Sequence, residues 1–155
     1  MTVLRPAEAG DLAAIEACVE AAYRPWVARI GREPGPMADD YAAAIAAGRV
    51  TVAVLASGVA GLLVLVRKDG EMLLDNVAVR PEAAGRGIGR ALIAHAEGAA
   101  RAAGLGAISL YTNARMVENV AFYERLGYRV FDRRVERGFD RIYMRKWLAP
   151  PGGKI

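Results

Sequence analysis

The sequence predicts a single mixed α/β (α+β) domain, with a mostly antiparallel central sheet of six to seven strands flanked by about four helices. Two observations support this fold class. The chain has 155 residues, of which 54% are hydrophobic and 25% charged, and this composition suits one globular domain with a sizeable core. Hairpin turn signals join the early apolar segments and again the last two, which argues against a doubly wound parallel sheet.

The first part of the chain is expected to contain one strand and two helices. Thr2–Arg5 is a short apolar stretch before a proline and predicts the first strand. Asp11 is expected to cap a helix, because apolar residues follow it at helical spacing. Arg24–Pro36 contains three prolines and two glycines and predicts a loop. A second short helix is expected from Asp39 to Ala47.

Three strands are expected next. Val50–Ala56 and Val59–Arg67 are apolar runs on either side of Ser57-Gly58, which is a hairpin signal. Asp69-Gly70 then turns the chain into a third strand, Met72–Val79. These segments predict an antiparallel first half of the sheet.

The second half alternates helices with strands and ends in a hairpin. A glycine follows the end of each of these helices, as is common because the residue after a helix end often adopts a left-handed conformation. The expected elements are a helix over about Gly89–Ala103, a strand over Ala107–Thr112, a helix over Ala114–Leu126, and strands over Tyr128–Val135 and Arg141–Trp147 around the turn Arg137-Gly138. Residues 150–155 are expected to form a flexible tail after a domain that spans residues 1–149.

Composition and charge argue against several classes of protein. The net charge is +4, but basic residues alternate with acidic ones instead of forming a continuous stripe with aromatics, so no nucleic-acid partner is expected. No apolar run approaches the roughly 20 residues of a membrane helix, and the first residues lack the apolar core of a secretory signal. We therefore expect a cytoplasmic protein without a membrane partner. Cys18 is the only cysteine, so neither a disulfide nor a metal site is expected.

A glycine-rich segment follows the expected strand Met72–Val79. Gly85, Gly87 and Gly89 stand directly before a helical stretch, with Arg86 and Arg90 among them. A strand, a glycine loop and a helix start can cradle a phosphate, because the first amides of a helix lack acceptors and carry partial positive charge. A tight turn that uses glycine for positive φ is the alternative. The segment has neither a Walker ending nor the spacing of a dinucleotide motif.

Two motifs together resemble the GNAT superfamily of acyl-CoA-dependent N-acetyltransferases. Its Gln/Arg-x-x-Gly-x-Gly/Ala motif reads here Ala84-Gly85-Arg86-Gly87-Ile88-Gly89, with alanine at the first position. A second block, Asn119–Tyr128, is similar to the family's helix-plus-strand segment, in which a tyrosine approaches the thioester sulfur. The order of the expected elements also resembles that fold from Thr2 to about Leu148.

The resemblance implies an enzyme that moves an acetyl group from acetyl-CoA, as co-substrate and without a metal, to a primary amine by direct attack in a ternary complex. The Val77 amide would polarise the thioester carbonyl, and Tyr123 would protonate the departing thiolate. The strand backbone would pair with pantetheine, the loop amides would hold the pyrophosphate, and Asn119 would bond to the pantetheine or adenylate side. The implied cofactor-binding residues are Val77, Ala78, Val79, Gly85, Arg86, Gly87, Ile88, Gly89, Arg90 and Asn119.

The resemblance does not carry over a general base, because Leu73 stands where the family often has a catalytic glutamate. Asp75 alternates with Leu73 and Val77 on one strand face and is our candidate base, with Glu71 and Tyr111 as weaker choices. A purely local role for Asp75, such as a bond to backbone, is the equal alternative.

The acceptor is expected to be a small-molecule or peptide amine. Tyr23, Arg24 and Trp26 precede the proline-rich segment where the family usually builds its acceptor pocket, and Asn76 is assigned to substrate binding with them. An aromatic pair beside an arginine suits a carboxylate-bearing amine, but the same residues could anchor the loop. The alternative to an enzyme is a CoA-binding sensor or regulatory module that has lost its chemistry. A third possibility is transfer of an acyl group to oxygen, or transfer of a longer acyl group. The protein could also form a homodimer.

Overall fold

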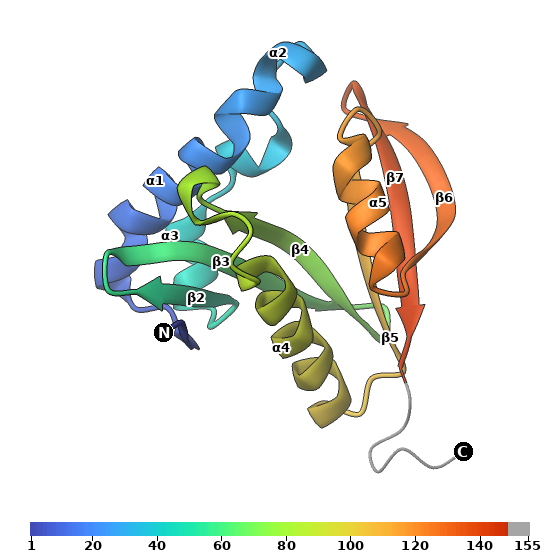
Figure 1. Cartoon of the computed structure of the whole chain (residues 1–155). Coiled ribbons are helices and arrows are strands. Elements are labelled where there is room, and N and C mark those ends of the chain that lie inside the picture. Colours follow the sequence, from blue (N-terminus) through green and yellow to red (C-terminus); the bar gives the residue numbers. More distant parts are fainter. Residues whose placement is uncertain (149–155) are drawn as a thin grey trace. The chain divides into compact units, whose positions relative to one another are not determined.

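A computed structural model describes residues 1–148 of the chain (Figure 1). The expected tail at 150–155 and residue 149 lie outside the described residues. The fold class is confirmed, since the chain forms one α/β domain around a mixed sheet of seven strands. Within it the contacts define two compact units, one made of Met1–Leu65 and Asn76–Ala96 and the other of Val66–Asp75 and residues 97–148. None of the helices in residues 1–148 is long and apolar enough to cross a membrane.

The strands are arranged in the order β1-β2-β3-β4-β5-β7-β6. Antiparallel pairs join β1 to β2, β2 to β3, β5 to β7 and β7 to β6, whereas β4 pairs with β5 in parallel. The strands are β1 (Val3–Pro6), β2 (Val50–Leu55), β3 (Gly58–Lys68), β4 (Glu71–Val79), β5 (Ala107–Asn113), β6 (Arg129–Glu136) and β7 (Phe139–Trp147).

The four expected helices are present, and a fifth segment of four residues is added to them. The α-helices are α1 (Leu12–Tyr23), α2 (Val27–Ile30), α3 (Tyr41–Ala46), α4 (Ile88–Ala102) and α5 (Val117–Arg125). Short 3-10 turns η1 (Ala9–Asp11), η2 (Arg24–Trp26), η3 (Gly35–Ala38) and η4 (Pro81–Ala83) join some of these elements.

The first unit packs α1 and α3 against β2, β3 and β4. Alternate residues of a strand share one face, and apolar helix residues at spacings of three and four cover it. Burying one such aliphatic side chain contributes about 1.5–3 kcal/mol. The cluster consists of Ile15, Cys18, Val19, Tyr41, Val50, Val52, Leu62, Val64 and Ala78.

Gly61 on β3 allows a close approach within this unit. A Cβ atom at that position would lie 2.9 Å from the carbonyl oxygen of Ala78 and 3.2 Å from a methyl carbon of Ile88. Real Cβ atoms do not come so close to backbone oxygens. Glycine therefore lets the end of β4 and the first residue of α4 lie directly against β3.

The second unit has its own core. Ile108, Leu110 and Thr112 alternate along β5 and are buried, as is Met144 on β7. Tyr128, the residue before β6, is fully buried. This unit therefore buries one face of its strands, as the alternation of its apolar residues predicts.

Two of the predicted two-residue turns, one between β3 and β4 and one between β6 and β7, lie where the sequence predicts them. Asp69 and Gly70 have φ of 53° and 77°, and Arg137 and Gly138 have φ of 53° and 80°. Positive φ at both central residues is the geometry of a type I′ turn, whose twist matches that of the flanking strands. A turn of this type sets the register of the strands that it joins, as in the pairing of Glu136 with Phe139 between β6 and β7.

The loop predicted over Arg24–Pro36 is wrong for its first part. The chain continues there as η2 and α2, and this helical segment ends at Gly31, which has φ of 89°. Pro25 is tolerated because it stands in the first turn, where its missing amide hydrogen has no helical partner to lose. Gly31 supplies the left-handed residue that closes the helix.

The starts of three predicted helices differ in detail from the prediction. Asp11 precedes α1 but does not cap it, because its carboxylate accepts from the Glu8 amide at 2.8 Å and from Arg5. The helix α3 is capped by Asp40, one residue after the predicted start at Asp39, since the Asp40 side chain accepts from the amide of Ala43 at 3.0 Å. The helix predicted from Ala114 begins at Val117.

Candidate functional site

The glycine-rich segment lies between η4 and the first turn of α4. Gly85 and Gly87 have φ of 80° and 77°, with open space where a Cβ would stand. Side chains rarely tolerate this conformation, so both positions need glycine for the backbone path. Gly89 has no positive φ and belongs to the first turn of α4.

The amides of this segment are open. Past η4 the first backbone hydrogen bond runs from the Ala91 amide to the Gly87 carbonyl, at 3.0 Å. Within residues 1–148 the amides from Gly85 to Arg90 donate no hydrogen bond to the protein. Gly85 and Gly87 have positive φ on either side of Arg86, which does not, and alternation of this kind is typical of anion-binding concavities.

Arg86 and Arg90 add positive charge beside these amides. Both are exposed, and neither forms an ion pair with another residue of the described chain. A loop with open amides at a helix start and two such guanidinium groups is suited to a phosphate or pyrophosphate. Both explanations of the glycines therefore apply, since the turn that requires positive φ is also the turn that exposes the amides.

The end of β4 leads into this loop. Burial alternates there, with Asn76 and Ala78 buried and Val77 and Val79 half-buried. The parallel register of β4 with β5 covers Met72–Leu74, so the residues from 77 to 79 lie beyond it. The last residues of β4 thus have the extended backbone that a peptide-like ligand could pair with.

A chain of hydrogen bonds fixes this part of β4 inside the first unit. The Tyr23 hydroxyl donates to the side-chain oxygen of Asn76 and lies 3.3 Å from the Val77 carbonyl oxygen. The Asn76 amide donates to the Tyr41 hydroxyl at 2.9 Å, which donates to the Pro36 carbonyl at 2.6 Å. Asn76 is only 3% exposed, so these bonds satisfy a buried polar group.

This chain brings together two residues that the sequence assigned to substrate binding, Tyr23 and Asn76. Tyr41 completes it and was missed by the sequence analysis. The residues around Tyr41 indicated only that it belongs to the short helix α3. Its partner Asn76 lies 35 residues further along the chain, so no local pattern marks the contact.

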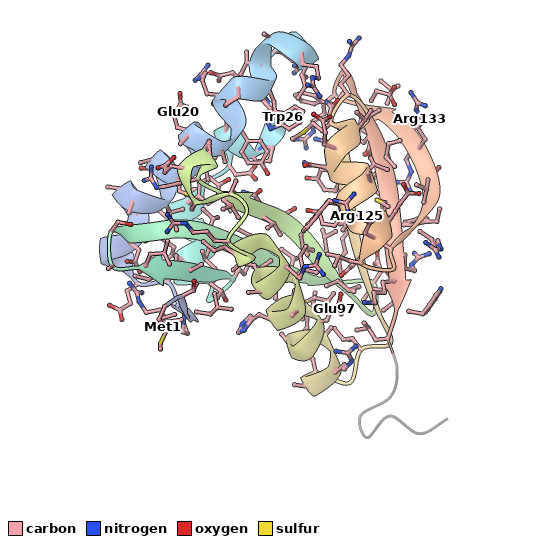
Figure 2. The ribbon with its side chains drawn as sticks, viewed as in Figure 1. Met1, Glu20, Trp26, Glu97, Arg125 and Arg133 are labelled. Atoms are coloured by element: carbon pink, nitrogen blue, oxygen red, sulfur yellow. The ribbon has the colours of Figure 1, made fainter. Side chains whose placement is uncertain are left out.

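Arg24 and Trp26 make contacts of their own near the end of α1, where Glu20 and Trp26 are labelled in Figure 2. The Arg24 guanidinium forms ion pairs with Glu20 at 2.7 Å and Glu33 at 2.9 Å. The guanidinium of Arg29 lies 4.7 Å from the centre of the Trp26 ring. For Arg24 these contacts favour the alternative in which it anchors the loop.

Asp75 belongs to the second unit and is half-buried on the β4 face that it shares with Leu73. Glu71, one of the weaker base candidates, is engaged by Arg145 at 2.9 Å. The Tyr111 ring is covered by the Arg141 guanidinium, whose carbon lies 4.6 Å from the ring centre. Glu71 and Tyr111 thus each have an arginine as a neighbour, and Asp75 stays the candidate base that the sequence suggests.

Tyr123 is buried on α5 with 8% of its surface exposed. Its ring packs edge-on against Phe122, with centres 5.4 Å apart, and against Tyr128, with centres 5.9 Å apart. Burial raises the pKa of the Tyr123 phenol to about 12. Because of this raised pKa, the phenol is protonated over the whole neutral range. Within residues 1–148 its hydroxyl forms no hydrogen bond to another residue, so its proton is available for donation.

Asn119 lies one helical turn before Tyr123 on α5 and is half-buried. Its backbone amide donates to the Met116 carbonyl at 3.0 Å. The spacing of four residues puts Asn119 and Tyr123 on one face of the helix, as the sequence predicts.

Comparisons with known proteins show which family and fold the chain resembles. A family model described as an acetyltransferase (GNAT) domain matches residues 46–130. The PaiA N-acetyltransferase of Thermoplasma acidophilum, solved with coenzyme A, superposes with a TM-score of 0.80 at 18% identity, over 95% of this chain and 99% of that one. The ribosomal-protein-S18-alanine N-acetyltransferase of Escherichia coli gives 0.73 at 20% identity, over 100% and 99%. Nourseothricin acetyltransferase gives 0.72 at 22%, over 94% and 98%. No curated protein sequence matches the chain.

Proposed function

The chain belongs to the GNAT acetyltransferase family, and on this premise we propose that it moves an acetyl group from acetyl-CoA to a primary amine by direct attack in a ternary complex. The observation that carries the proposal is the run of open amides from Gly85 to Arg90 at the start of α4. The protein solved with coenzyme A shares this fold over nearly its whole length.

In this proposal the loop binds the pyrophosphate of the co-substrate. The amides of residues 85–90 donate to its oxygens, and Arg86 and Arg90 neutralise its charge. The extended backbone of Val77, Ala78 and Val79 pairs with the amides of the pantetheine arm. Asn119 bonds to the pantetheine or adenylate side.

Acetyl-CoA supplies an activated thioester, and the protein's part is to orient it and to move two protons. The Val77 amide donates to the thioester oxygen, where negative charge develops during attack. An amine such as lysine has an ordinary pKa of about 10.4, so a base must take its proton before it attacks, and Asp75 has this role.

Tyr123 donates the second proton to the departing thiolate. A thiol has an ordinary pKa near 8.5, below the value of about 12 that burial gives the Tyr123 phenol. Tyr123 therefore acts as a hydrogen-bond donor that becomes stronger as negative charge develops on sulfur. It transfers its proton to the extent that burial raises the pKa of the thiol as well.

The acceptor in this proposal is a small-molecule or peptide amine bound near Tyr23, Arg24, Trp26 and Asn76. Two of the similar structures are named for acceptors of both kinds, the ribosomal protein S18 alanine and nourseothricin. We place the enzyme in the cytoplasm, with no metal, nucleic acid or membrane as a partner.

A CoA-binding module without chemistry is the second candidate. Leu73 favours it, because it stands where the family often has a catalytic glutamate. The two candidates differ in one measurement, the release of free CoA thiol in the presence of a panel of amines. Turnover with any amine supports the enzyme, and CoA binding without turnover supports the module.

The binding half of the proposal is tested with two matched variants. Gly87→Glu and Gly48→Glu place the same side chain at glycines with φ of 77° and 72°, both in open space, but only Gly87 lies in the loop. CoA at about 100 times its dissociation constant should stabilise the wild type and Gly48→Glu by roughly 2.7 kcal/mol. Gly87→Glu should lose this stabilisation. A wild type that CoA does not stabilise would contradict the proposal.

A further inference from the structure

Glu97 is a buried carboxylate that the proposed function does not use. It extends from α4, is labelled in Figure 2, and has 8% of its surface exposed. Its oxygens accept from the Tyr128 hydroxyl at 2.9 Å and from the Lys146 ammonium at 3.1 and 3.2 Å. Arg101, one turn along α4, lies 3.9 Å away. A buried charge is tolerated when it is paired and hydrogen-bonded in this way.

Tyr128 connects this ion pair to Tyr123. The Tyr128 backbone amide donates to the Tyr123 carbonyl at 3.1 Å. The two rings pack edge-on, with centres 5.9 Å apart and planes at 66°. Gly127, which directly precedes Tyr128, has φ of 96° and closes α5 so that the chain turns back at once.

Lys146 also braces this turn. A Cβ atom on Gly127 would lie 3.4 Å from the last side-chain carbon of Lys146, so that side chain runs directly past the glycine on its way to Glu97. The Lys146 nitrogen lies 5.7 Å from the centre of the Tyr128 ring. The Tyr128 ring is therefore fixed at its hydroxyl by Glu97 and flanked by a cation that is fixed by the same carboxylate.

Tyr123 has no such hydrogen bond of its own within the described chain, so packing on Phe122 and Tyr128 sets its ring orientation. We propose that Glu97 and Lys146, acting through the Tyr128 hydroxyl, hold the Tyr123 phenol in the orientation from which it donates its proton. Glu97, Tyr128 and Lys146 are then positioning residues. This inference rests on the proposed role of Tyr123 as the acid.

A double-mutant cycle tests the inference with the full chain. Tyr128→Phe removes only the hydroxyl that Glu97 holds, and it is made with tyrosine and with phenylalanine at position 123. With Tyr123 present we expect kcat to fall about fivefold to tenfold, and KM for acetyl-CoA to stay within about twofold. When Tyr128→Phe is added to Tyr123→Phe, it should lower kcat by less than about a further twofold. The effects of two substitutions are not additive when one residue acts through the other.

Tyr143→Phe is the matched control. Its hydroxyl also donates to a carboxylate of the second unit, Glu136, but its ring does not pack against Tyr123. We expect Tyr143→Phe to leave kcat unchanged. If Tyr128→Phe lowers kcat by the same factor with and without Tyr123, or does not lower it at all, the inference is overturned while the proposed function stands.

A different result separates the failure of the proposed function. If Tyr123→Phe alone leaves kcat unchanged, Tyr123 is not the acid, and the inference is overturned with that role. Should Tyr128→Phe not fold, the pair Glu97→Met with Lys146→Met takes its place in the cycle, because removing both charges leaves neither one buried and unpaired. The same non-additive loss of kcat supports the inference, and an additive loss overturns it.

Discussion

The hydroxyl of Tyr23, at the last residue of α1, donates a hydrogen bond to the side-chain oxygen of Asn76, which lies 53 residues further along the chain on β4. Because Asn76 is buried and directly precedes Val77, this bond ties the helix to the part of the strand that we assign to pantetheine and the thioester.

Asn76→Leu should destabilise the protein. The substitution removes both hydrogen bonds of Asn76 and leaves the Tyr41 hydroxyl without its donor in a buried site. Leaving one buried polar group unsatisfied costs about 1–3 kcal/mol, so we expect a loss in this range in urea denaturation at neutral pH. A change below about 0.5 kcal/mol would mean that water replaces the amide and that the network is not a structural tie.

Tyr123→Phe should lower kcat by about 100-fold, because general acid catalysis is typically worth 10²–10⁴-fold and water recovers part of it. The ring and its packing remain, so CoA affinity by calorimetry and the melting temperature should not change. A kcat within about threefold of wild type would remove Tyr123 from the chemistry.

The pH dependence of kcat should lack an alkaline limb from Tyr123 below about pH 11. The phenol acts in its protonated form, and burial raises its pKa to about 12, so its contribution is lost only as the pH rises through that value. Ultraviolet titration of the tyrosines, compared between wild type and Tyr123→Phe, checks the assignment. A phenolate of Tyr123 that forms near pH 10 would contradict it.

Stability should fall in acid through Asp11. The hydrogen bond from Arg5 comes first among the causes that lower the Asp11 pKa to about 2, and the Glu8 amide adds to it. A carboxyl group whose pKa is lowered on folding stabilises the folded state at pH values above its ordinary pKa of about 3.9. This stabilisation is lost as the pH falls toward 2. We expect Asp11→Asn to cost about 1 kcal/mol at pH 6, after a discount for solvent screening, and almost nothing near pH 2. A difference between the two proteins that is the same at both pH values would rule out Asp11 as the source.

Trp26→Ala and Arg24→Ala test the proposed acceptor site. If these residues contact the amine, its KM should rise while acetyl-CoA affinity stays within about twofold, as loss of uniform binding predicts. The ion pairs of Arg24 with Glu20 and Glu33 provide the contrast. Equal damage to both affinities, together with a lower melting temperature, would show that Arg24 anchors the loop.

The sequence predicted the parts of the fold that depend on neighbouring residues. Asp69-Gly70 and Arg137-Gly138 fix their turns by local chemistry, and the glycines at 85 and 87 have the positive φ that the loop requires. The short helix α2 was missed because prolines mark the start of a helix as well as a loop. Asp39 and Asp40 are chemically alike, so only the geometry shows which one caps α3.

The contacts that the sequence could not predict join distant residues. Tyr41 reaches Asn76 across 35 positions, and Tyr128 reaches Glu97 across 31. Nothing in the local pattern of a short alanine-rich helix or of a mid-helix glutamate indicates such a partner. The position of a residue along a strand predicts which face of the sheet it lies on. Its partner on that face depends on how the helices pack.

Gly61 shows how far the requirements of the loop extend. A single methyl group at this position would press on the Ala78 carbonyl and on Ile88, which lie at the end of β4 and the start of α4. In a library of point variants selected for CoA-dependent activity, Gly61 would therefore tolerate as few replacements as the glycines of the loop. A survey of tolerance alone would count it as a ligand-binding residue, although its effect is to set how closely the binding segments approach the sheet.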